Sequence, residues 1–223
     1  MTIKAVNFMY RKPGWAVEEF QDYWRSTHGD MIRKIPDIKG YTQCHTLLSG
    51  YARSAPPPAD GIEELSFDSP EAIEIMETSD EGRSAVADLD KFADTSRVCR
   101  IITKEVIIKE GATHEGMVKN IEFVTRKAGM HLEDFRQYWK TVHGPMAARI
   151  EVIKRYVQSQ THMSEYDKTL PPAYDGVAET WFEDTAAMRH SATTPEYATQ
   201  LADIVNFLAE ELPFIITKEI KML

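Results

Sequence analysis

The chain has 223 residues, of which 43% are hydrophobic and 27% charged, as is typical of a soluble globular protein. Its net charge of −9 argues against a nucleic-acid partner, because phosphate binding needs clustered lysine and arginine. The apolar runs are too short to cross a membrane, and the first residues lack the apolar core of a signal peptide.

Cysteine usage favours a reducing, cytoplasmic setting. The two cysteines, Cys44 and Cys99, are too few for a disulfide framework or a metal cluster. No pair of histidines or cysteines has metal-ligand spacing, and no glycine-rich phosphate loop is present. We therefore expect no metal site and a small molecule or another protein as the partner.

Hydrophobic periodicity predicts the elements of the first half of the chain. Alternating apolar residues predict strands, and apolar residues at three- and four-residue steps predict helices. In chain order we predict a strand at 3–10, a helix at 16–30, strands at 39–48 and 61–67, helices within 69–93 and a strand at 98–108.

The second half repeats this order after a turn-rich linker at 110–116. Gly144-Pro145 indicates an interruption or kink in its first helix, and Thr193 or Thr194 is a candidate cap where the later helical region breaks. We predict a strand at 118–126, a helix from Leu132, strands at 155–162 and 176–182, helices within 184–210 and a strand at 214–220.

The two halves are copies of one another at a constant offset of 115 residues. The match includes Phe20/Phe135, Trp24/Trp139, His28/His143, Tyr41/Tyr156, Gln43/Gln158, Glu64/Glu179 and Phe92/Phe207. A shared spacing over nearly the whole length indicates an internal duplication, with domains at 1–110 and 117–223.

The order β-α-β-β-α-β predicts an α+β fold made of two ferredoxin-like repeats. Each repeat would place both helices on one face of a four-stranded sheet, and the bare face must be buried. Pairing the two bare faces gives an α+β barrel, closed within one chain as a pseudo-dimer or between two chains of a homodimer.

Face assignments predict which residues enter the enclosed space. On the first strand of each copy we expect Val6, Phe8, Ile121 and Phe123 against the helices, so Asn7 and Glu122 face the interior. On the third strands we expect Leu65, Phe67, Thr180 and Phe182 on the helix side and Ile62, Glu64, Ser66, Val177, Glu179 and Trp181 inside.

A polar stripe on the second strands completes this predicted interior. It comprises Tyr156, Gln158, Gln160 and His162 in the second copy and Tyr41, Gln43 and His45 in the first. Unpartnered polar groups are costly in a purely structural core, so the stripe favours a pocket with placed polar groups. If the copies do not close on one another, the stripe faces solvent instead.

The titratable candidates each have a functional and a structural interpretation. His28 and His143 suit proton transfer near neutral pH, or they are buried histidines at a helix end. Tyr41 and Tyr156 are oxyanion donors or aromatic anchors. Glu64, Glu122 and Glu179 are bases with pKa values raised by burial, or solvated carboxylates at strand ends.

The strings Tyr138-Trp139, His143-Gly144-Pro145 and Tyr156-Val157-Gln158 resemble the EthD family of the dimeric α+β barrel superfamily. The resemblance covers both copies. It implies that His28, Tyr41, His143 and Tyr156 line a pocket and act in acid–base chemistry without a metal or an organic cofactor. The first copy departs from the pattern at His28-Gly29-Asp30, so we expect the second copy to carry the better-formed site.

These features favour a cofactor-independent isomerase, cyclase, dehydratase or lyase acting on a small aromatic, lactone or polyketide-like substrate. His143 would be the general acid or base, Tyr156 the oxyanion donor, and Gln158, Glu179 and Trp181 would orient the substrate. Two alternatives stay open: a non-catalytic binder of a hydrophobic metabolite or haem, and a cofactor-free monooxygenase.

Overall fold

A computed structural model describes residues 3–223 of the chain. The first repeat consists of strand β1 (Ile3–Met9), helix α1 (Val17–Tyr23), π-helix η1 (Trp24–His28), α2 (Gly29–Ile32), β2 (Gly40–Thr46), 3-10 helix η2 (Leu48–Ala52), β3 (Gly61–Phe67), α3 (Pro70–Thr78), α4 (Asp80–Phe92) and β4 (Cys99–Lys109). Helix α4 begins where the Ser79 side chain accepts a hydrogen bond from the Gly82 amide.

The second repeat has the same order. It consists of β5 (Val118–Val124), α5 (Leu132–Tyr138), π-helix η3 (Trp139–His143), α6 (Gly144–Ala148), β6 (Ile153–Thr161), 3-10 helix η4 (Met163–Asp167), β7 (Gly176–Phe182), α7 (Thr185–Ser191), α8 (Pro195–Asp203), 3-10 helix η5 (Ile204–Asn206) and β8 (Phe214–Lys221). The predicted break falls between α7 and α8, where Thr194 caps α8 ahead of Pro195.

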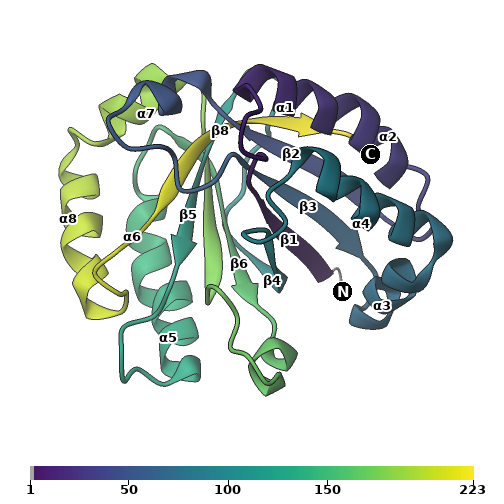
Figure 1. Cartoon of the computed structure of the whole chain (residues 1–223). Helices are drawn as coiled ribbons and strands as arrows, with labels where there is room; N and C mark the ends of the chain where they lie inside the picture. The colour runs from purple at the N-terminus through teal and green to yellow at the C-terminus, as the bar shows by residue number, and fades with distance from the viewer. Residues whose placement is uncertain (1–2) are drawn as a thin grey trace.

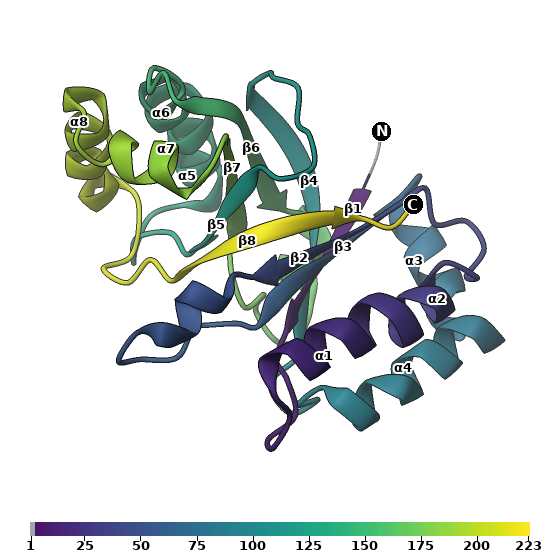
Figure 2. The same cartoon turned by 90° about the horizontal axis from the view of Figure 1, so that it is seen from above.

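The eight strands form one closed barrel in the order β1-β3-β2-β8-β5-β7-β6-β4. Every neighbouring pair of strands is antiparallel. The helices of the two repeats lie on opposite outer sides of the barrel (Figures 1 and 2). The α+β pseudo-dimer barrel predicted from the duplication is confirmed, and it closes within this one chain.

The last strand of each repeat joins the two halves. Strand β4 pairs with β1 of its own repeat and with β6 of the other, and β8 pairs with both β5 and β2. Each repeat therefore contributes a strand edge to the sheet of its copy. Because closure pairs these edges, the strands within residues 3–223 leave no open sheet edge.

The predicted faces of the first strands are wrong. Phe8 and Phe123 meet edge-on inside the barrel with ring centroids 4.9 Å apart, in a cluster that also holds Val6 and Ile121. Asn7 on the alternate face donates to Glu63 under the helices of the first repeat. Glu122 likewise lies on the helix side of the second repeat, with His143 and Ala147.

The predicted interior position of the polar stripe is also wrong. Gln43 and Gln158 lie beneath the helices, where each donates to the backbone carbonyl of the tryptophan that begins the π-helix. The remaining stripe residues of β2 and β6 share that face: Tyr41, His45, Tyr156 and Gln160. His162, placed in the same stripe, lies beyond the end of β6 and caps η4.

Both errors have one physical cause. The barrel sheet is buried on both faces, since one face packs on helices and the other closes on itself, and every residue of β1 is buried. Alternating hydrophobicity identifies the core face only when the other face meets solvent. The third strands follow the prediction, with Leu65, Phe67 and Phe182 under the helices and Ile62 and Val177 inside.

Candidate functional site

The histidine of each repeat lies at the end of a π-helical turn. In the second repeat, α5 ends at Tyr138 and the wider turn of η3 ends at His143. A Cβ on Gly144 would lie 3.0 Å from the Gln158 amide nitrogen and 3.1 Å from the Trp139 carbonyl oxygen. The glycine after the histidine therefore makes room for the Gln158–Trp139 hydrogen bond of 2.8 Å. Such π-turns are frequent at functional sites.

A carboxylate and an amide hold the His143 ring. Nδ1 of His143 lies 3.0 Å from Oδ2 of Asp203, and Nε2 lies 2.9 Å from the amide nitrogen of Gln200. Burial lowers the pKa of His143, and the hydrogen bond to Asp203 opposes that shift. The geometry fits a neutral imidazole that donates from Nδ1 to Asp203 and accepts at Nε2 from Gln200.

The hydroxyl of Tyr156 has its own proton available for a ligand. Its oxygen accepts from the indole nitrogen of Trp139 at 3.1 Å and from the amide of Gln158 at 3.2 Å. Within residues 3–223 that hydroxyl has no acceptor for its own proton. Burial raises the pKa of Tyr156, so the group stays protonated and can donate to an oxygen in the pocket.

Glu122 supplies a carboxylate to this site. It faces the same pocket as Tyr156, and one of its oxygens accepts from Asn120 at 3.1 Å. Burial raises the pKa of Glu122 to about 7. A carboxylate with that pKa is suited to accept a proton at neutral pH.

These three groups open into one pocket between the sheet and the helices of the second repeat. Its volume is about 440 Å³, within the range usual for small-molecule sites. Most of the wall is apolar and comes from α6, β6, β7, α8, β8 and the segments that follow α6 and precede β8: Ala147, Ile150, Ile153, Ala178, Phe182, Leu201, Leu212 and Phe214. The pocket therefore fits a mainly apolar molecule with a few polar atoms.

The corresponding space in the first repeat is nearly filled, with a volume of about 50 Å³. Glu63 lies where the second repeat has Ala178 and accepts from Trp24, Tyr41 and Asn7. His28 contacts Asp88 at 3.0 Å, as His143 contacts Asp203. The first repeat thus keeps the histidine and the tyrosine, but the Glu63 side chain occupies the position of a ligand.

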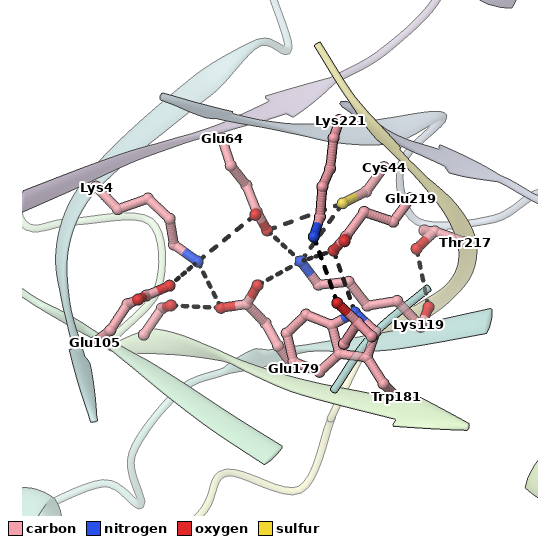
Figure 3. Close-up of polar contacts among 12 residues, drawn as sticks. Lys4, Cys44, Glu64, Glu105, Lys119, Glu179, Trp181, Thr217, Glu219 and Lys221 are labelled. Atoms are coloured by element: carbon pink, nitrogen blue, oxygen red, sulfur yellow. Dashed lines mark hydrogen bonds and ion pairs between the residues drawn. The ribbon is translucent and has the colours of Figure 1, made fainter. Parts of the chain in front are cut away.

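A second group of predicted site residues lies elsewhere, inside the barrel (Figure 3). Lys119 lies 2.7 Å from Glu64 and 2.6 Å from Glu179, and its ammonium group stands 4.6 Å above the Trp181 ring. Lys4 contacts Glu179 at 2.7 Å. Glu64, Glu179 and Trp181 therefore belong to a buried ion cluster on the opposite face of the sheet from Tyr156.

The structure thus divides the predicted site residues into two sets. His143, Tyr156 and Glu122 line the pocket, and Gln158 and Gln160 support Tyr156 from beneath it. Ala178 and Gln200 of the pocket, and Asp203, which holds the His143 ring, were not predicted. Asp203 could have been found, because it recurs as Asp88 at the same offset of 115.

Comparison with known families agrees with this architecture. The model of the EthD domain matches the chain twice, at residues 12–96 and 127–211. The chain therefore belongs to the EthD domain family and carries two copies of the domain. No curated protein matches the chain significantly.

Solved structures with the same fold cover nearly the whole chain. A candidate monooxygenase from Lactobacillus acidophilus NCFM has a TM-score of 0.56 and 14% identity, with 100% of this chain and 94% of that chain covered. A candidate monooxygenase from Fusobacterium nucleatum gives 0.62 and 7%, covering 100% and 93%. An anthrone oxidase-like protein gives 0.63 and 10%, covering 99% and 93%. At these identities the likeness establishes the fold alone.

The described helices offer no membrane span, since none within residues 3–223 combines enough length with enough apolar character.

Proposed function

We propose that the chain is an enzyme that transfers protons to and from a small, mainly apolar compound bearing a carbonyl or phenol oxygen. The observation that carries the proposal is the pocket of the second repeat, where a proton acceptor and an unengaged proton donor face one space. Glu122 is the acceptor and the hydroxyl of Tyr156 is the donor. Apolar walls favour an aromatic, lactone or polyketide-like substrate.

In the proposed reaction, the Glu122 carboxylate removes a proton from the carbon next to the carbonyl group. The electron pair moves to the carbonyl oxygen, and the resulting enolate accepts the hydrogen bond from Tyr156. Return of a proton to a different atom gives isomerisation, and expulsion of a leaving group gives dehydration or lysis. His143 is the second proton-transfer group, and it is released for this role when the Gln200 amide leaves Nε2.

A cofactor-free monooxygenation would begin with the same deprotonation. Two proteins with the same fold are described as candidate monooxygenases, which motivates this alternative. Their likeness to this chain is limited to the fold. Consumption of dissolved oxygen during turnover separates the two reactions, because isomerisation, dehydration and lysis need none.

The test is exchange of carbon-bound hydrogen with solvent. We expect the purified protein to catalyse deuterium incorporation from heavy water into members of a panel of cyclic ketones, lactones and anthrones, detected by mass spectrometry. Tyr156→Phe should lower the exchange rate by about 10²- to 10³-fold, the usual cost of losing one oxyanion donor.

Tyr41→Phe in the first repeat is the matched control, because its hydroxyl is bonded to Glu63 and does not face an open pocket. We expect it to leave exchange unchanged. Equal losses in the two variants, or none in either, would contradict the assignment of the site. Stable binding of panel members without any exchange or product would instead identify a non-catalytic binder.

A further inference from the structure

A second hollow adjoins the pocket of the second repeat. It is a groove of about 410 Å³ between the loop that follows β2 in the first repeat and the segment that begins β8. Figure 2 shows this loop beside the start of β8. Leu212 and Phe214 line both the groove and the pocket, so the two hollows share one wall.

An arginine of the first repeat stands at this wall. The guanidinium of Arg53 lies 5.7 Å from the centroid of the Phe214 ring. Arg53 is exposed, and within residues 3–223 its side chain forms no ion pair or hydrogen bond. Its five N–H donors are thus available to a ligand, and their planar geometry matches a carboxylate.

The loop that carries Arg53 is stiffened by its sequence. Ala55-Pro56-Pro57-Pro58 line the groove, and each proline ring fixes one backbone angle. A groove with a stiff apolar floor loses little conformational entropy when a ligand binds. The apolar floor and the single cation at the rim suit an aliphatic or aromatic chain that ends in an anion.

The strand register places the two hollows within reach of a single ligand. Glu122 and Phe214 are cross-strand partners in the β5–β8 ladder. Since side chains of such partners are neighbours on one face of the sheet, the path from Glu122 past Phe214 to Arg53 is on the order of 10 Å.

We propose that the groove is an extension of the substrate site and binds the far, carboxylate-bearing end of an elongated substrate. The reactive end of that substrate lies at Glu122 and Tyr156, so this inference rests on the proposed function. It gives the first repeat a role in the chemistry of the second, although Glu63 fills its own pocket.

The reciprocal arrangement is absent from the described part of the chain, which makes a matched control available. Lys168 occupies the position of Arg53 in the second repeat, and it forms an ion pair with Glu165 at 2.6 Å. In the strand register, Arg100 takes the place of Phe214 in the first repeat, because it pairs with Asn7 as Phe214 pairs with Glu122. The Arg100 side chain donates to Asn7 at 2.6 Å.

The proposal is tested by measuring, with isothermal titration calorimetry, how tightly phenyl-substituted carboxylates of increasing length bind. Benzoate, phenylbutyrate and phenyloctanoate share a phenyl ring and differ in how far the carboxylate extends. For the wild type we expect affinity to increase with length. Arg53→Gln should weaken phenyloctanoate binding by about tenfold, as expected of one lost charge-assisted hydrogen bond, and leave benzoate binding unchanged.

Lys168→Gln should bind all three compounds like the wild type. An Arg53→Gln variant that matches the wild type for phenyloctanoate, or that loses the same factor for benzoate, would overturn the extension of the site. Neither result bears on the proposed proton transfer, which the Tyr156→Phe exchange experiment tests separately. If Tyr156→Phe loses exchange activity but binding does not depend on ligand length, the pocket remains the reaction site and the groove is not part of the substrate site.

Discussion

At the scale of single residues, the two equivalent tyrosines differ in where their protons point. Tyr41 donates to Glu63 at 3.1 Å, whereas the Tyr156 oxygen accepts from Trp139 and Gln158. The backbone positions are the same in both repeats, so the neighbour decides the difference. The Glu63 carboxylate accepts the hydrogen bond of the Tyr41 hydroxyl. In the second repeat Ala178 stands at that position, so the Tyr156 hydroxyl keeps its hydrogen bond for a ligand.

Glu122 gives the activity a defined pH dependence. Burial raises its pKa to about 7, so the carboxylate that accepts a proton forms as the pH rises through 7. We expect deuterium exchange to increase with pH and to level off above about 8. Glu122→Gln should lower exchange by about 10²- to 10⁴-fold, the range for a lost general base, and abolish this rise.

The same raised pKa affects stability with the opposite trend. The folded chain holds the Glu122 proton more tightly than the unfolded chain does, so stability falls as the pH rises from about 4.5 to 7. Glu122→Gln should remove this part of the decrease in urea denaturation. Glu210→Gln, at an exposed carboxylate of the same pocket, is the control and should retain both profiles.

Some residues of the site could be predicted because their side chains recur in both repeats. His143 and Tyr156 were predicted because they match the EthD pattern and because His28 and Tyr41 repeat them 115 residues earlier. Ala178 acts by leaving space that Glu63 fills in the first repeat, and a missing side chain has no chemical signature in a sequence. Glu122 was predicted to share a site with Tyr156 inside the barrel. Both residues lie on the helix side instead, so they still line one pocket.

At the scale of elements, strand order was predictable and strand orientation was not. The predicted strand ends agree with β1 to β8 within two residues, because turn residues and changes in periodicity mark them. The faces depend on which of two buried environments a side chain enters. Phe8 and Phe67 are both fully buried, one inside the barrel and one under the helices, and hydrophobicity does not separate them.

Replacing Ala178 on β7 by glutamate, the residue at the matching position of β3, should fill the pocket of the second repeat. Ala178→Glu places a carboxylate where Tyr156 and Trp139 can donate to it, as Tyr41 and Trp24 donate to Glu63. We expect this variant to fold, to lose at least about tenfold in phenylbutyrate affinity and to lose exchange activity, because the new side chain occupies the pocket.

Glu63→Ala is the complementary change and should open a pocket in the first repeat. It leaves the buried donors of Trp24, Tyr41 and Asn7 without an acceptor, which costs about 1–3 kcal/mol for each unsatisfied group. Urea denaturation measures that loss.

The Ala178→Glu prediction has a clear contrary outcome. If Ala178→Glu binds phenylbutyrate as tightly as the wild type does, this compound does not bind in the pocket.

At the scale of the whole molecule, the buried ion cluster links the repeats reciprocally. Lys4 of the first repeat contacts Glu179 of the second, and Lys119 of the second contacts Glu64 of the first (Figure 3). These four residues are themselves duplicated pairs at the offset of 115. The sequence is compatible with closure of the barrel within one chain or between two, because the same residue pattern serves both. The reciprocal contacts and the exchanged strands β4 and β8 provide the closure within one chain.

Lys119 should be the residue of this cluster on which stability depends most. Its ammonium group is fully buried and lies within 2.7 Å of both Glu64 and Glu179. Lys119→Met keeps an unbranched side chain, one atom shorter, and removes the charge shared by the two carboxylates. Breaking a buried ion pair costs about 3–5 kcal/mol, so we expect a loss of that size in urea denaturation at pH 8.

The loss in Lys119→Met should shrink as the pH falls, for a reason that the cluster itself supplies. Burial and the nearby Glu179 raise the pKa of Glu64 to about 8, so this carboxyl is mostly protonated at pH 6 and needs less compensation there. In the wild type, the same raised pKa makes stability fall as the pH rises from about 4.5 to 8. Glu64→Gln should flatten that decrease and, combined with Lys119→Met, should recover part of the stability lost at pH 8. A Lys119→Met variant that is as stable as the wild type at both pH values would show that the cluster does not hold the two repeats together.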